Sequence, residues 1–173
     1  MRKNLVLLGM MGVGKTTLGK IVSKMTGLKF IDTDSNIEKS CLMKISEIFT
    51  KKGEKFFRLE EKKEVLKSIK TSNSIIALGG GAFIDKTIRE NILKNTISIW
   101  LDADLKVLKE RTKWNNKRPL LNKENGQKEM GKLYEARKSI YKQAHHRINC
   151  SGLTKKNIAK KIISLYEKYK INN

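Results

Sequence analysis

Gly9-Met10-Met11-Gly12-Val13-Gly14-Lys15-Thr16 is the stretch that decides the fold of this 173-residue chain. Its pattern, G-x-x-x-x-G-K-[ST], is that of a loop that surrounds the phosphates of a nucleoside triphosphate. An apolar run at residues 5–8 precedes the loop, and apolar residues recur behind it at helical spacing, namely Leu18, Ile21, Val22 and Met25. We therefore expect a buried parallel strand, the loop and an amphipathic helix ending near Gly27, in direct succession.

Each part of this loop has a separate role in holding phosphate. The glycines let the backbone turn tightly enough to direct its N–H groups at phosphate oxygens, at the positive end of the following helix. Lys15 adds a positive charge for the β and γ phosphates, and the Thr16 hydroxyl is suited to hold Mg²⁺. The loop therefore predicts a nucleoside triphosphate as the first ligand.

Length and composition bound the class of protein. A chain of 173 residues fits one domain, which at this size buries roughly 70% of its unfolded surface. The two cysteines, Cys41 and Cys150, lie far apart, which favours a reducing compartment over a disulfide framework. The sequence contains no run near the ~20 apolar residues of a membrane span. We expect a cytoplasmic protein without a membrane partner.

The net charge of +21, with an isoelectric point near 10.0, is a usual first sign of nucleic-acid binding. The lysines, however, are spread over polar helix faces, and neither a base-reading module nor an aromatic stacking platform is evident in the sequence. We interpret the charge as a surface that attracts anionic ligands and expect no specific nucleic-acid partner. A nucleic-acid-binding ATPase is the alternative from a different class.

Apolar strands alternate with amphipathic helices, which predicts an α/β fold with a parallel sheet and helices on both faces. The expected strands are residues 4–8, 29–32, 74–78, 96–101 and 147–150. A long helical segment, about residues 35–70, separates the second strand from the third. Residues 113–127 hold the only proline and four asparagines, which indicates a mobile surface loop. This loop is either a lid or an inert connection.

Polar and glycine residues follow the second and third strands. Asp32 and Asp34 are one residue apart, so on an extended chain both carboxylates would project to the same side. One could assist Mg²⁺ and the other orient a hydroxyl, although Asp34 could also be a helix cap. Gly79-Gly80-Gly81 ends the third strand, where bare backbone can approach a ligand and offer N–H donors. Ligands of such folds collect at this edge of the sheet.

Several separated motifs together resemble the shikimate kinase family over essentially the full length of the chain. They are the phosphate loop with Thr17 and Gly19, Asp32 and Asp34, Arg58 in Phe56-Phe57-Arg58-Leu59-Glu60-Glu61, the three glycines, Arg118-Pro119-Leu120-Leu121, and Tyr134-Glu135-Ala136-Arg137 with Tyr141. The resemblance implies a three-layer P-loop kinase fold, with a five-stranded parallel sheet in the order 2-3-1-4-5. It also implies one domain over residues 1–173, with a substrate-binding region at about 33–61 and a lid at about 112–126.

The resemblance further implies that ATP phosphorylates the 3-hydroxyl of shikimate, a step of aromatic amino acid biosynthesis, with Mg²⁺ held by Thr16 and, through water, Asp32. Asp34 would contact ring hydroxyls and accept the proton of the attacking one. Arg58 and Arg137 would hold the substrate carboxylate, with backbone donors from Gly79, Gly80 and Gly81. The implied ATP-binding residues are Gly12, Val13, Gly14, Lys15, Thr16, Thr17, Arg111, Arg118 and Pro119. Lys15 and Arg118 would also be catalytic, the latter when the lid closes.

Paired arginines suit this assignment because a planar guanidinium binds a carboxylate through two hydrogen bonds. Ion pairing with Glu61 or Glu135 on the same helix is the alternative for each arginine. Phe49 and Phe57 would wall the pocket or belong to the core. A gluconate-type kinase is the nearest rival, and the arginine pair with the glycine run favours shikimate. We expect shikimate and ATP as the partners and a monomeric protein.

Overall fold

The computed structural model describes residues 3–112 and 126–171 of the chain. Within these ranges the strands are β1 (Asn4–Leu8), β2 (Lys29–Asp32), β3 (Ser74–Ala77), β4 (Thr96–Asp102) and β5 (His146–Asn149). They form one parallel sheet in the order β2-β3-β1-β4-β5, which confirms the expected topology. The sequence-based strand limits agree with the observed ones to within one residue.

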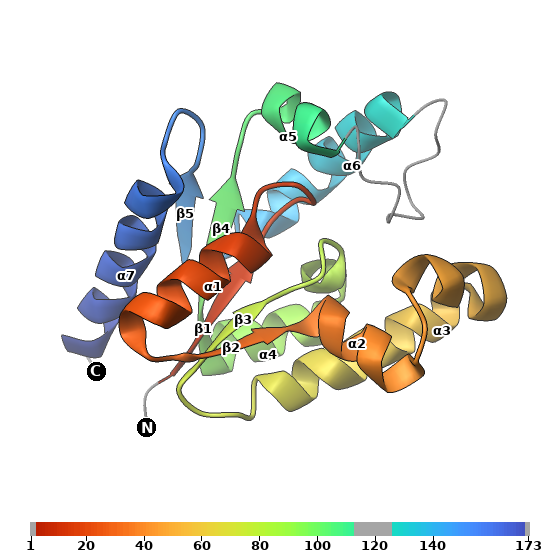
Figure 1. Ribbon diagram of the computed structural model, residues 1–173, viewed down its shortest axis with the longest axis horizontal. Coiled ribbons are helices and arrows are strands. Elements are labelled where there is room, and N and C mark those ends of the chain that lie inside the picture. Colours follow the sequence, from red (N-terminus) through yellow and green to blue (C-terminus); the bar gives the residue numbers. More distant parts are fainter. Residues whose placement is uncertain (1–2, 113–125, 172–173) are drawn as a thin grey trace.

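Helices cover both faces of this sheet (Figure 1). Helices α1 (Lys15–Thr26) and α7 (Lys155–Ile171) pack side by side on one face, and α4 (Lys86–Asn95) lies on the other. The remaining elements are α2 (Thr33–Cys41), α3 (Ile45–Ser68), the short 3-10 helix η1 (Ala82–Ile84), α5 (Leu105–Thr112) and α6 (Gly126–Tyr141). The arrangement is the expected three-layer α/β fold.

The core is centred on β1 and β4, every residue of which is buried. Helices on both faces explain this, because a central strand of a parallel sheet is covered on each side and is therefore buried along its whole length. Trp100 and Leu101 of β4 and Val6 of β1 are at most 1% exposed. None of the helices in the described ranges is long and apolar enough to cross a membrane.

The limits of the helices follow from local sequence signals. Gly27 ends α1 in the left-handed conformation, with φ of 72° and its N–H donated to the Ser23 carbonyl at 2.9 Å. At the other end of the chain the Thr154 hydroxyl accepts the N–H of Asn157 at 3.2 Å and caps α7. The end of α1 at Gly27 agrees with the helix limit expected from the sequence.

The long helical segment expected between the second and third strands is two helices joined by an elbow. Leu42, with φ of 52°, ends α2, and α3 is itself kinked at Gly53, where φ is 83°. Behind this elbow a second, small apolar cluster forms around Ile37, Ile48 and Phe57. The segment therefore stands as an arm at the edge of the sheet, next to β2 (Figure 1).

Candidate active site

The phosphate loop connects β1 to α1, as expected. Gly12 and Gly14 have φ of 81° and 101°, a backbone conformation that glycine adopts without strain. A Cβ atom added at Gly12 would lie 2.8 Å from Cγ2 of Thr112 and 3.8 Å from Cβ of Arg111. The loop therefore packs against the C-terminal end of α5, which places Arg111, an expected ATP contact, beside it.

Lys15 lies inside the loop that it is expected to serve. The residue is only 8% exposed, and its Nζ donates to the carbonyl oxygens of Gly9 at 2.8 Å and Met10 at 3.0 Å. These bonds hold the ammonium group at the rim of the loop, where phosphate oxygens would replace or join the carbonyl acceptors.

Thr16 and Asp32, the two expected Mg²⁺ residues, are in direct contact. The Thr16 hydroxyl donates to Oδ2 of Asp32 at 2.7 Å, which joins the start of α1 to the end of β2. The other oxygen, Oδ1, accepts the N–H of Ser35 at 3.1 Å and caps α2. A hydroxyl and a carboxylate are hard oxygen donors, so the pair fits a magnesium ion chemically.

The expected geometry of the two aspartates was wrong. Because α2 begins at Thr33, the chain is not extended between Asp32 and Asp34, and Asp34 lies in the first helical turn. The cap of that helix is Asp32, so the helix-cap alternative for Asp34 is wrong as well. Asp34 instead faces Gly79, where an added Cβ would lie 2.5 Å from its Oδ1.

The three glycines after β3, residues 79–81, lie against the side chains that are expected to bind the phosphoryl acceptor. We call these three residues the glycine floor. A Cβ at Gly79 would meet Asp34 and Glu61, a Cβ at Gly81 would lie 2.7 Å from Nη1 of Arg58, and one at Gly80 would lie 3.8 Å from Nη1 of Arg137. The same added atom at Gly80 would be 3.5 Å from the backbone nitrogen of Met11. The glycine floor therefore lies between the side chains expected to bind the phosphoryl acceptor and the phosphate loop.

Part of the hydrogen-bonding capacity of this floor is used within the fold. The N–H of Gly79 is donated to the Thr33 hydroxyl at 3.1 Å, which in turn donates to the Ala77 carbonyl at 3.3 Å. The carbonyl of Gly80 accepts from Nη1 of Arg137 at 3.1 Å and from the Tyr141 hydroxyl. The backbone N–H groups that remain as expected donors to a ligand are therefore those of Gly80 and Gly81. Thr33 has a structural role that was not predicted from the sequence.

The structure separates the two arginines. Arg58 is paired with its own helix, through Nη2 to Glu54 at 2.9 Å and Nη1 to Glu61 at 2.7 Å, so the ion-pair alternative is present for this residue. Arg137 is 8% exposed and reaches across to Gly80. The two guanidinium groups therefore approach the same floor from α3 and α6, two helices far apart in the sequence.

Glu61 is the main addition to the site. The sequence indicated Glu61 only as a counter-ion for Arg58, but the residue is 2% exposed and lies beside Asp34 against Gly79. Burial, and more weakly the negative charge of Asp34, raises the pKa of Glu61, while the charges of Arg58 and Arg137 oppose that rise. Burial cannot be deduced from the alternation of charges along an amphipathic helix.

Phe49 and Phe57 belong to the apolar cluster behind the elbow. Their ring centroids are 4.8 Å apart, and Phe57 is 4% exposed. The guanidinium of Arg58 lies 5.3 Å from the Phe57 ring centroid, so this cluster supports the arginine from behind. Arg118 and Pro119, with nearly all of the expected lid, lie outside the described residues.

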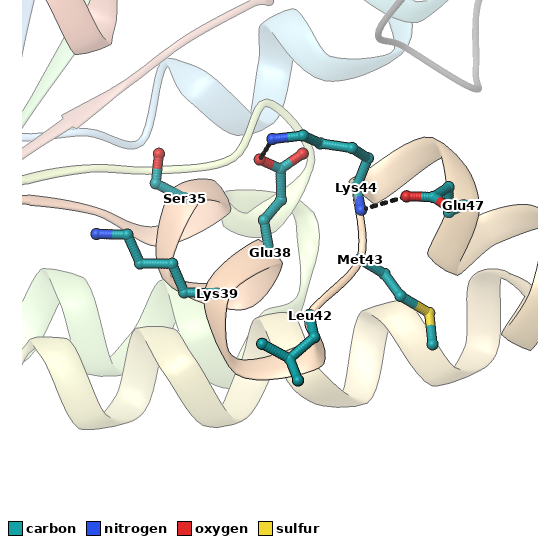
Figure 2. Close-up of a pocket in the computed structure, with 7 residues that line it drawn as sticks. All are labelled: Ser35, Glu38, Lys39, Leu42, Met43, Lys44 and Glu47. Carbon is teal, nitrogen blue, oxygen red and sulfur yellow. Dashed lines mark hydrogen bonds and ion pairs between the residues drawn. The ribbon is translucent and has the colours of Figure 1, made fainter.

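A separate hollow of about 450 Å³ lies on the elbow between α2 and α3. Figure 2 shows its lining, which consists of Ser35, Glu38, Lys39, Leu42, Met43, Lys44 and Glu47. Glu38 pairs with Nζ of Lys44 at 3.2 Å, and Glu47 accepts the backbone N–H of Lys44 at 2.9 Å. This hollow contains none of the expected site residues, and its side chains neutralise one another.

A phosphate loop on a five-stranded parallel sheet, next to a buried floor with acidic and basic side chains, defines a P-loop kinase that acts on a small acidic molecule. Comparison with known proteins gives the family. The family model described as shikimate kinase matches residues 11–167. The chain belongs to the shikimate kinase family.

Individual relatives agree with this assignment. A shikimate kinase from Bartonella quintana is 42% identical over 168 residues, which cover 97% of this chain and 80% of the relative. The solved structure of a shikimate kinase from Acinetobacter baumannii in complex with shikimate is 31% identical, with a TM-score of 0.93 over 97% of this chain and 94% of that one. A gluconokinase structure from Sinorhizobium meliloti, at 12% identity and a TM-score of 0.63 over 99% of this chain and 95% of that one, shares the fold alone.

Proposed function

We propose that this chain transfers the γ-phosphoryl group of ATP to the 3-hydroxyl of shikimate. The observation that carries the proposal is the glycine floor, because it sets Asp34, Arg58 and Arg137 around one spot that adjoins the phosphate loop. Phosphoryl transfer requires mainly positioning and charge neutralisation, so this adjacency of donor and acceptor sites is what the reaction needs.

The acceptor would be recognised by charge and by shape. Arg137 and Arg58 hold the carboxylate of shikimate, and Asp34 accepts a hydrogen bond from a ring hydroxyl. In this role Arg58 keeps its bond to buried Glu61 and exchanges exposed Glu54 for the substrate carboxylate. Residues 33–61 would then form the acceptor-binding region within a single domain.

The nucleotide would bind across the loop and the start of α1. Backbone N–H groups of Gly12, Val13 and Gly14 would donate to the phosphates, with that of Val13 exchanging its 3.4 Å bond to the Met10 carbonyl. Lys15 would neutralise the transferring group, and Thr17 follows in the first turn of the helix. Thr16, and Asp32 through water, would hold Mg²⁺, which neutralises phosphate charge when bound. Arg111, whose Cβ lies beside Gly12 of the loop, would contact the base.

Asp34 would orient the attacking hydroxyl and receive its proton as the oxygen–phosphorus bond forms. The chemistry requires a carboxylate within hydrogen-bond reach of the acceptor, and Asp34 is the carboxylate that the first turn of α2 directs over Gly79. Burial, and more weakly the charge of Asp34, raises the pKa of Glu61, so the carboxyl group beside Asp34 binds a proton more readily than an exposed glutamate does.

An ADP-release assay tests the proposal directly. ATP and Mg²⁺ are supplied with shikimate, gluconate, a nucleoside monophosphate or single-stranded DNA in turn. We expect release of ADP with shikimate alone. Turnover with gluconate would favour the rival kinase, and stimulation by DNA that disappears between about 50 and 200 mM salt would favour a nucleic-acid-binding ATPase.

A further inference from the structure

One face of α6 is joined to the rest of the molecule at four levels. The side chains at Met130, Tyr134, Arg137 and Tyr141 recur at intervals of three or four residues and therefore share this face. Met130 Sδ accepts from the Thr112 hydroxyl at 3.3 Å at one end, and Tyr141 bonds Gly80 at the other. The two middle levels are Tyr134, which reaches the end of β4, and Arg137, which reaches the glycine floor after β3.

Tyr134 binds a buried carboxylate at the end of β4. Its hydroxyl donates to Oδ1 of Asp102 at 3.1 Å, and Asp102 is 4% exposed. Burial, and secondly the charge of Asp102, raises the pKa of Tyr134 to about 12. The hydroxyl therefore keeps its proton at neutral pH and remains a donor to this carboxylate.

Asp102 is itself held by Arg147 of β5. The second carboxylate oxygen, Oδ2, accepts from Nε of Arg147 at 3.0 Å and from Nη2 at 2.7 Å. The guanidinium also lies 4.8 Å from the ring centroid of Trp100, which packs against Tyr141 with ring centroids 6.0 Å apart. The cluster Trp100–Asp102–Arg147 thus contacts α6 at two tyrosines.

These two tyrosines lie on either side of Arg137 along α6. Tyr134 stands three residues before it and Tyr141 four residues after it. An arginine has four rotatable side-chain bonds, so its guanidinium keeps one position only if its contacts and the helix that carries it are both held. The Tyr134 bond holds α6 on the N-terminal side of Arg137, whereas the carbonyl of Gly80 accepts from Arg137 itself and from Tyr141 on the C-terminal side.

We propose that Asp102, through Tyr134, is a positioning residue that fixes α6 so that Arg137 reaches the acceptor carboxylate. The inference rests on the proposed function of Arg137 as a carboxylate-binding group. Asp102, Tyr134 and Arg147 contact neither substrate in this scheme. Their effect is therefore on the affinity for the acceptor and not on the chemical step.

Tyr134→Phe is the primary test, because it removes one hydroxyl and keeps the ring. We expect the KM for shikimate to rise about 3- to 10-fold, the size of one lost hydrogen bond, with kcat and the KM for ATP within about twofold of wild type. Tyr166→Phe is the matched control. Tyr166 lies on α7, away from the site, and its hydroxyl donates to the Lys3 carbonyl at 3.0 Å. This substitution should lower the melting temperature and leave the KM for shikimate unchanged.

A double-mutant cycle with Asp102→Asn distinguishes positioning from a general loss of stability. Asparagine keeps the size of Asp102 and an oxygen acceptor but weakens the charged bond to Arg147. If Asp102 acts through Tyr134, the KM for shikimate of the double variant should be close to that of the single variant with the higher KM. It should lie well below the value expected if the two fold-increases in KM were multiplied.

The inference is overturned if the KM for shikimate is unchanged in Tyr134→Phe, if kcat and both KM values change equally, or if the single effects multiply. Wild-type enzyme in the same assay distinguishes a failure of the positioning role from a failure of the proposed function. Active wild type with an unaffected Tyr134→Phe removes only the positioning role. Wild type could instead fail to phosphorylate shikimate while calorimetry still detects shikimate binding that Tyr134→Phe weakens. That outcome would overturn the proposed reaction and leave the positioning role in place.

Discussion

The carboxylate of Glu61 lies 2.7 Å from Nη1 of Arg58 and shields one side of that guanidinium from solvent. The Glu61 side chain is 3% exposed, whereas that of Glu54, which binds Nη2, is 54% exposed. The two ion pairs of Arg58 therefore differ in cost to break, because only the exposed one can be replaced by water. Arg58 has a fixed side and an exchangeable side, and a substrate carboxylate would bind at the second.

Glu61→Gln should change how stability depends on pH. The pKa of Glu61 is raised in the folded protein, so between its unfolded value near 4.5 and its folded value the native state binds more protons than the unfolded state. Stability from this group is therefore present at acid pH and is lost as pH rises through the folded pKa. The melting temperature of wild type minus that of Glu61→Gln should fall from pH 4.5 toward neutrality. A difference that grows with pH would contradict the assignment.

Arg137→Lys should weaken shikimate binding by roughly 1.5–3 kcal/mol, because lysine lacks the planar fork that binds a carboxylate twice. Calorimetric titration with shikimate and with ATP measures both affinities. Arg89→Lys is the control, since Arg89 donates to the carbonyls of Phe83 and Ile84 in a structural role. An equal loss for both ligands in Arg137→Lys would show damage to the fold.

Asp34→Asn should depress phosphorylation of shikimate far more than binding of ATP. The amide keeps the size of the side chain over Gly79 but cannot accept a proton, so a loss of about 10²- to 10⁴-fold in kcat is expected. Stopped-flow or steady-state kinetics measures kcat, and nucleotide titration provides the comparison. Unaltered turnover would leave Asp34 as a polar neighbour of Glu61 without a part in the reaction.

Thr16→Val should raise the concentration of Mg²⁺ needed for half-maximal activity. Valine has nearly the shape of threonine but removes the oxygen that bonds Oδ2 of Asp32. Activity is measured against free Mg²⁺ at fixed ATP, with Thr26→Val at the other end of α1 as the comparison. If Thr16→Val and wild type show the same Mg²⁺ dependence, Thr16 does not hold the ion.

The sequence was most informative where local patterns alone determine structure. The glycine positions of the phosphate loop, the apolar run of β1 and the stop at Gly27 depend on neighbours in the chain and were predictable. The geometry of Asp32 and Asp34 was not predictable in this way, because the helix begins at Thr33, two residues before the expected start at about residue 35. Helix limits are set by capping bonds that compete with the strand, here the bond from Ser35 to Asp32.

Contacts between distant elements account for the remaining features that sequence reasoning missed. Glu61 reads as one more charge on a polar helix, and its burial depends on α2 and the glycine floor lying against it. The bond of Tyr134 to Asp102 joins residues 32 positions apart. Such contacts follow from the fold as a whole, so the local pattern indicated Glu61 as a partner of Arg58 but could not indicate Gly80 as the partner of Arg137.

Gly79 shows how a residue with no side chain can limit the evolution of this centre. Oδ1 of Asp34 and Oε1 of Glu61 would lie 2.5 and 2.8 Å from a methyl carbon at that position. Even alanine would push two acids apart and shift them out of alignment with the arginines. In a library of all single substitutions, this position should tolerate as few replacements as the charged residues around it, because an absent atom sets the spacing of the charges.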